Sequence, residues 1–192
     1  MRVIIDTSSL LSLVRYYLPF DNNGVLFEFI KNKILNNEIF IIDEVMVESG
    51  FNSKGIILKE LEYLTDTSFK KTSKQPINTE FLPAPAPSKF INQVDNSFIN
   101  ASIRNKLTDE QYDSRRKTFL QSADARMIIY ALNRKHNDSS ERCVIVTEET
   151  EGSNDQKEFK KIPAICKILN IECMTLPSLI EQYKGQINLV IN

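Results

Sequence analysis

The sequence predicts a three-layer α/β/α fold around a central, mainly parallel sheet of four or five strands. Short, fully apolar runs alternate with longer helical patterns along most of the chain. Such continuous runs are typical of strands that are buried on both faces, as they are in parallel sheets. A chain of 192 residues is long enough to bury one full core, so we expect a single domain over residues 1–192.

The first part of the chain reads as strand, helices, strand, helix. The first strand is expected at residues 2–6 and the second at 39–42, because both are short apolar runs. Two helices are expected between them, at 7–17 and 24–36, and a third begins at Asp43, which we expect to be its N-cap.

The alternation resumes near residue 122. Ser122 is expected to cap a helix that ends near Arg134, and an apolar run at 143–147 predicts the next strand. Pro163 suits the first turn of a following helix. A last strand is expected at 171–174, before a final helix. This βα order favours the layered α/β class.

Residues 66–121 interrupt the pattern and form a predicted insertion, partly helical, within the domain. They contain Pro76 and a Pro-Ala-Pro-Ala-Pro run at 83–87, which we expect to be neither helix nor central strand. The segment holds nine Lys and Arg against six Asp and Glu, a net charge of +3. These charges are either solvated or used for binding. The basic clusters are Lys70, Lys71 and Lys74 at one end and Arg115, Arg116 and Lys117 at the other.

The composition excludes several classes of protein. A net charge of −1 excludes a histone-like nucleic-acid binder, and three cysteines exclude a zinc site built from four. We expect the cysteines to be small core residues in a reducing compartment. His136 is the one histidine, which excludes any mechanism that needs two in one chain. The sequence has no signal-peptide pattern and no apolar stretch long enough for a membrane span, so we expect a soluble, cytoplasmic protein.

Acidic residues follow the predicted strands at several places. Asp6 ends the first strand, Glu48 lies in the helix after the second, and Asp124 is in the first turn of the helix that Ser122 opens. Glu148 and Glu149 follow the strand at 143–147. Because the carboxyl ends of parallel strands share one edge, these side chains are expected to meet there. Each acid also has a simpler interpretation, either as a side chain that stabilises the N-terminus of a helix or as an exposed surface charge.

Carboxylates that share a site need a positive counter-charge, since like charges at short range raise the energy of the ionised state. A hard divalent cation is the natural choice, and Mg²⁺ or Mn²⁺ prefers oxygen ligands. Such ions activate water and stabilise charge on phosphate oxygens. The acids therefore favour metal-dependent phosphoryl chemistry.

Four segments together resemble the motifs of the PIN-domain family. Residues 3–10 (Val-Ile-Ile-Asp-Thr-Ser-Ser-Leu) resemble the first motif and residues 41–48 (Ile-Ile-Asp-Glu-Val-Met-Val-Glu) the second. Residues 122–131, with Ala-Asp-Ala at the helix start, resemble the third, and residues 144–149 resemble the fourth, usually Thr-x-Asp. The tail at 161–175 is similar to the closing helix and strand, whereas the insertion is unmatched.

The resemblance implies a Mg²⁺- or Mn²⁺-dependent endoribonuclease, similar to the VapC-type toxins of bacterial toxin–antitoxin pairs. It implies Asp6, Glu48 and Asp124 as metal-binding, catalytic acids, with the fourth at Glu149. Glu149 replaces the usual Asp, and Glu148 remains its rival. The same resemblance implies supporting roles for Ser8 and Thr147, beside Asp6 and Glu149.

The partners implied are an RNA substrate, a cognate antitoxin and a second copy of the chain in a homodimer. The two basic clusters are the residues expected to hold the RNA backbone or an antitoxin segment. A rival interpretation is a catalytically inactive PIN-like module that binds nucleic acid or protein. A receiver-type signalling domain is disfavoured because Asp6 has no acidic neighbour, and an Asp-x-Asp phosphatase because position 8 is Ser.

Overall fold

Four parallel strands form the centre of the protein, as seen in a computed structural model that describes residues 1–151 and 157–187. The strand order is β2-β1-β3-β4, with Val3 opposite Ile39 and Ile5 opposite Val146. The predicted parallel sheet is therefore confirmed. The strands are β1 (Arg2–Ile5), β2 (Ile39–Phe40), β3 (Cys143–Val146) and β4 (Glu172–Met174).

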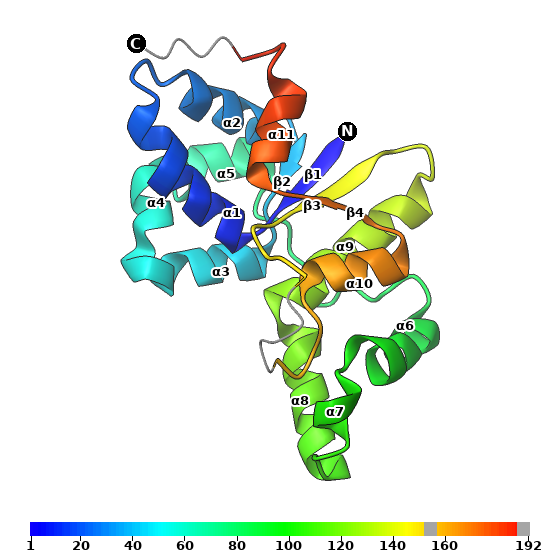
Figure 1. The fold of residues 1–192 in the computed structure, drawn as a ribbon. Helices are drawn as coiled ribbons and strands as arrows, with labels where there is room; N and C mark the ends of the chain where they lie inside the picture. The colour runs from blue at the N-terminus through cyan, green and yellow to red at the C-terminus, as the bar shows by residue number, and fades with distance from the viewer. Residues whose placement is uncertain (152–156, 188–192) are drawn as a thin grey trace.

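Helices cover both faces of this sheet and give the predicted three layers (Figure 1). Helices α1, α2 and α11 lie on one side, where Phe29 of α2 packs edge-on against Tyr183 of α11. Helices α9 and α10 lie on the other. The α-helices are α1 (Thr7–Ser12), α2 (Val25–Leu35), α3 (Asp43–Phe51), α4 (Ile56–Glu60), α5 (Thr67–Ser73), α6 (Pro87–Gln93), α7 (Ala101–Arg104), α8 (Asp109–Gln121), α9 (Ala123–Asn137), α10 (Ile162–Leu169) and α11 (Leu176–Tyr183).

Two local predictions near the N-terminus need correction. The helix expected at 7–17 changes after α1 into a π-helical segment, η1 (Leu13–Tyr17), and then into a 3₁₀ turn, η2 (Leu18–Phe20), which contains Pro19. The predicted N-cap at Asp43 is wrong, because Ile42 is the N-cap of α3. The Asp43 carboxylate instead accepts hydrogen bonds from the amide and hydroxyl of Thr79.

The insertion is largely helical and contributes to the core. It holds α5 to α8 and a π-helical segment, η5 (Val94–Phe98), and buries Phe90, Phe98 and Phe119 in the main hydrophobic cluster. Its proline run also needs correction, since Pro87 occupies the first turn of α6, where a missing amide hydrogen costs no bond. Residues 87–121 project from the body as an arm (Figure 1).

All three cysteines lie in the described residues, and none forms a disulfide. As predicted, Cys166 lies on α10, whereas Cys143 and Cys173 lie on β3 and β4. Within the described ranges, no helix combines the length and apolar character needed to cross a membrane.

Candidate metal centre

Asp6 is the most enclosed acid at the carboxyl edge of the sheet. It directly follows β1, caps α1 and is 6% exposed. Its carboxylate accepts hydrogen bonds from the Thr7 amide (2.7 Å), the Ser8 hydroxyl (2.5 Å) and the Thr147 hydroxyl (2.8 Å). Burial raises the pKa of Asp6 in spite of these three donors, and the Glu149 carboxylate raises it further.

Glu48 reaches the same edge from α3 and is linked to Asp6 through Thr7. The Thr7 hydroxyl donates to Oε2 of Glu48 at 2.7 Å, while the Thr7 amide donates to Asp6. Burial raises the pKa of Glu48, and the carboxylates of Asp6 and Glu44 act in the same direction. Sequence reasoning singled out Ser8 as the hydroxyl partner and missed this bridging role of Thr7.

Asp124 enters the site from the first turn of α9. Ser122 caps that helix by accepting a hydrogen bond from the Ala125 amide at 3.3 Å, as predicted. Burial, followed by the carboxylates of Asp6 and Glu149, raises the pKa of Asp124 to about 7. The Lys157 ammonium acts in the opposite direction on this pKa, but its effect is smaller than that of burial and the two carboxylates.

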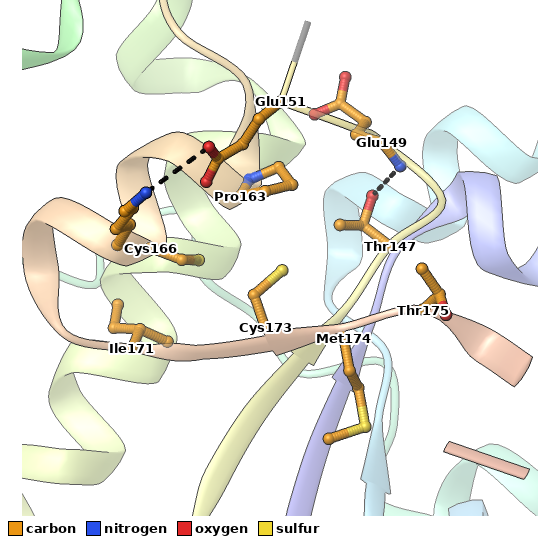
Figure 2. Close-up of a pocket in the computed structure, with 10 residues that line it drawn as sticks. Thr147, Glu149, Glu151, Pro163, Cys166, Ile171, Cys173, Met174 and Thr175 are labelled. Atoms are coloured by element: carbon orange, nitrogen blue, oxygen red, sulfur yellow. Dashed lines mark hydrogen bonds and ion pairs between the residues drawn. The ribbon is translucent and has the colours of Figure 1, made fainter. Parts of the chain in front are cut away.

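Glu148 and Glu149 are adjacent in sequence but face different helices. Glu148 accepts a hydrogen bond from the Leu176 amide at 2.7 Å, at the start of α11, and another from Ser9. Glu149 accepts from the Ile162 amide at 3.1 Å, at the start of α10. Its own amide donates to the Thr147 hydroxyl (Figure 2).

The two glutamates differ in the groups whose pKa they raise. The Glu149 carboxylate raises the pKa of both Asp6 and Asp124, whereas Glu148 raises that of Tyr17. The geometry thus brings Glu149 to the acidic edge and gives Glu148 the role of a helix cap.

The donor set of this edge fits a hard divalent cation. It offers carboxylate oxygens from four segments, and burial together with neighbouring carboxylates raises the pKa of Asp6, Glu48 and Asp124, which is the condition that a bound cation relieves. Within residues 1–151 and 157–187, however, no three ligating side chains are already arranged to hold an ion. Asp6, Glu48 and Glu149 instead accept hydrogen bonds from neighbouring protein groups.

The arm holds a lysine against this edge. Phe159 stacks on Phe119 of α8 with ring centroids 4.3 Å apart, and the segment around it pairs with residues 98–100. This pairing positions Lys157, whose ammonium group lies 3.1 Å from Oε1 of Glu149 and lowers the pKa of Asp124. The sequence gives no signal for Lys157, because its place depends on contacts between distant segments.

The two basic clusters lie far apart and do not form one surface. Lys70 and Lys71 are in the last turn of α5, which packs on α2, and Lys74 follows at its C-cap. The other cluster is on α8, which lies in the arm, away from α5 (Figure 1).

The α8 cluster is partly neutralised by acids. Arg115 pairs with Glu158 at 3.2 Å, and Arg116 pairs with Asp95 and Asp113. Lys117 is the third member of this cluster and lies about one turn before the end of α8.

The fold and the site define a three-layer α/β/α protein with an acidic cluster at the carboxyl edge of its sheet. Residues 3–187 match the family described as Domain of unknown function (DUF4411), and the chain belongs to that family. Searches of curated proteins and of solved structures gave no match.

Proposed function

We propose that this chain is a Mg²⁺- or Mn²⁺-dependent endoribonuclease of the PIN-domain type, acting as the toxin of a bacterial toxin–antitoxin pair. One observation carries the proposal: burial and neighbouring carboxylates raise the pKa of Asp6, Glu48 and Asp124, which come from three separate segments, and the Glu149 carboxylate of a fourth segment acts on two of them. Clustered acidic side chains with perturbed pKa values are typical of functional sites. The four acids are Asp6, Glu48, Asp124 and Glu149.

Each acid has a distinct part in this proposal. Asp6 is fixed by three donors and forms the rigid centre of the ligand set, with Asp124 and Glu149 as further ligands and Glu48 beside them. When bound, the cation supplies charge stabilisation at the phosphate and lowers the pKa of a bound water. Because the pKa of Asp124 is raised to about 7, a cation in the site would favour the ionised form of this carboxylate.

Lys157 is the residue best placed to contact an RNA phosphate beside the acids. Its ammonium group is within 3.1 Å of Glu149, so it shares the site with the proposed ligands. Charge-assisted contacts with phosphate are strong and salt-dependent. Lys117 of α8 is a second, more distant group for the RNA backbone.

The test is an RNA cleavage assay with the purified chain. Labelled single-stranded RNA is incubated with Mn²⁺ or Mg²⁺, with and without a chelator, beside Asp124→Asn and the exposed control Asp113→Asn. The proposal expects cleavage that is lost in the chelated sample and in Asp124→Asn but retained in Asp113→Asn. Cleavage that survives both treatments would contradict the site assignment.

One observation favours the second candidate, a PIN-like module that binds nucleic acid or protein without cleaving it. No three ligating groups of the described residues are already arranged around one point, and Glu149 is occupied by Lys157 and the Ile162 amide. RNA binding by a folded chain, with no cleavage in any of the metal ions, would favour this module over the nuclease.

A further inference from the structure

A cavity of about 420 Å³ opens beside Glu149, between α10, β4 and the chain that follows β3 (Figure 2). This volume lies within the range of about 300–1,000 Å³ that is usual for small-molecule sites. Ile171, Cys173, Met174 and Thr175, all in or beside β4, line it on one side. Figure 2 shows the Cys173 side chain pointing into the cavity.

The opposite wall comes from one face of α10. Pro163, Cys166 and Lys167 line the cavity at helical spacing. The apolar part of the lining therefore consists of a proline ring, two cysteines, an isoleucine and a methionine, which suits a flat, largely apolar group.

Charged groups stand at the mouth of this cavity. The Lys167 ammonium lies 3.8 Å from the Glu151 carboxylate, and both side chains are more than half exposed. An exposed ion pair of this length contributes little to stability, so a ligand can separate it at little cost. The mouth thus offers one acceptor group and one donor group side by side.

The cavity is continuous with the acidic edge. Thr147 and Glu149 line it, while the Thr147 hydroxyl also donates to Asp6. A nucleic-acid strand with a phosphodiester at the acids therefore has its neighbouring nucleotide next to this opening. Single-stranded RNA is commonly recognised by enclosing an unstacked base and bonding its Watson–Crick edge.

We propose that this cavity is a nucleobase subsite that selects guanine next to the cleaved phosphodiester; the inference rests on the proposed ribonuclease function. The N1–H and N2–H groups of guanine are adjacent donors that match the two oxygens of the Glu151 carboxylate. The neighbouring O6 accepts from the Lys167 ammonium. Adenine, cytosine and uracil lack two adjacent ring-edge donors beside an acceptor, so they match this pair less well.

The experiment measures how RNA protects Cys173 from alkylation. The Asp124→Asn chain is mixed with the pentaribonucleotides UUGUU, UUIUU with inosine, or UUUUU, and treated with iodoacetamide. Alkylation of each cysteine is followed by peptide mass spectrometry. Cys143, which lies on the neighbouring strand β3 and does not line the cavity, is the internal control.

The guanine subsite predicts that UUGUU slows alkylation of Cys173 at least about fivefold more than UUIUU does, since inosine lacks the N2 amino group. Alkylation of Cys143 stays unchanged. Adding Glu151→Gln reduces the difference to within about twofold, whereas Glu110→Gln on α8 leaves it intact. Equal protection by all three RNAs, or by none, overturns the subsite.

Cleavage of the same RNAs by the native chain separates this inference from the proposed function. Cleavage without guanine-selective protection rejects the subsite alone. Guanine-selective protection without cleavage rejects the nuclease and retains a guanine-binding site.

Discussion

The Thr147 hydroxyl donates a hydrogen bond of 2.8 Å to Oδ2 of Asp6, and this contact joins the end of β3 to the end of β1. Thr147 is buried and also accepts from the Glu149 amide at 3.2 Å. The Thr147 hydroxyl therefore orients both the side chain of Asp6 and the backbone of Glu149, two acids of the proposed site. Its removal tests whether the site is held by this network.

Thr147→Val should destabilise the fold by about 1–3 kcal/mol, because the buried Asp6 carboxylate loses a donor and the Glu149 amide loses its acceptor. Urea denaturation measures the free energy of unfolding. Thr147→Ser is the control, since it keeps the hydroxyl and removes only a methyl group. A valine variant as stable as the serine variant would contradict the network.

The stability of the metal-free chain should depend on the protonation of Asp124. Its folded pKa is about 7, above the ordinary value of 3.8, so the folded state binds more protons than the unfolded state between these pH values. The free energy of unfolding should therefore fall as pH rises through this range, with Asp124 contributing roughly 2–4 kcal/mol. Burial is the main cause, followed by the like charges of Asp6 and Glu149.

The measurement is urea denaturation between about pH 4 and pH 7.5 in a chelator. Asp124→Asn should show a shallower fall than the native chain, and Asp113→Asn should follow the native curve. Saturating Mg²⁺ should also flatten the curve, because the cation favours the ionised carboxylate. An identical slope in the native and Asp124→Asn chains would refute the perturbed pKa.

The two adjacent glutamates should behave differently. Glu149→Gln keeps an oxygen for the Ile162 amide but removes a charge from the acidic edge, so we expect RNA cleavage to fall by about 100-fold or more. Glu148→Gln should retain cleavage within about threefold, because the Glu148 carboxylate accepts from the Leu176 amide at the start of α11 and glutamine keeps an oxygen for that bond. Single-turnover kinetics would decide between them, and the reverse pattern would show that Glu148 is the fourth acid.

Lys157→Met should weaken RNA binding more than the chemical step. Its ammonium group lies at the acidic edge, where a contact with phosphate would add charge-assisted binding. We expect KM to rise about tenfold and kcat to stay within about twofold, with a smaller dependence of KM on salt. Lys106→Met, on the arm, is the matched control. An unchanged KM would contradict the proposed contact between Lys157 and the RNA phosphate.

Much of the fold could be predicted because the strand signals are local. The apolar runs that form β1 and β3 are buried on both faces, and the Ser122 cap and Pro163 mark the helix starts where they were expected. Asp43 was misassigned because its preference for an N-cap was overridden by a tertiary partner, Thr79.

The acids of the candidate site could be identified from their positions after strands, but their partners could not. Thr7 and Thr147 reach the acids only through side-chain directions and strand register, which the sequence does not specify. The arm was unpredictable for a related reason, since Phe119 and Phe159 are distant in sequence and meet only in the folded chain.

The most direct test of the central claim is a calorimetric titration of the native, metal-free chain with Mn²⁺, beside Asp124→Asn and Asp113→Asn. If the four carboxylates form one metal centre, the native chain and Asp113→Asn should bind Mn²⁺ equally well. Asp124→Asn should bind it about 10- to 100-fold more weakly. Equal Mn²⁺ affinity in all three chains, or no binding by the native chain, would contradict the metal centre.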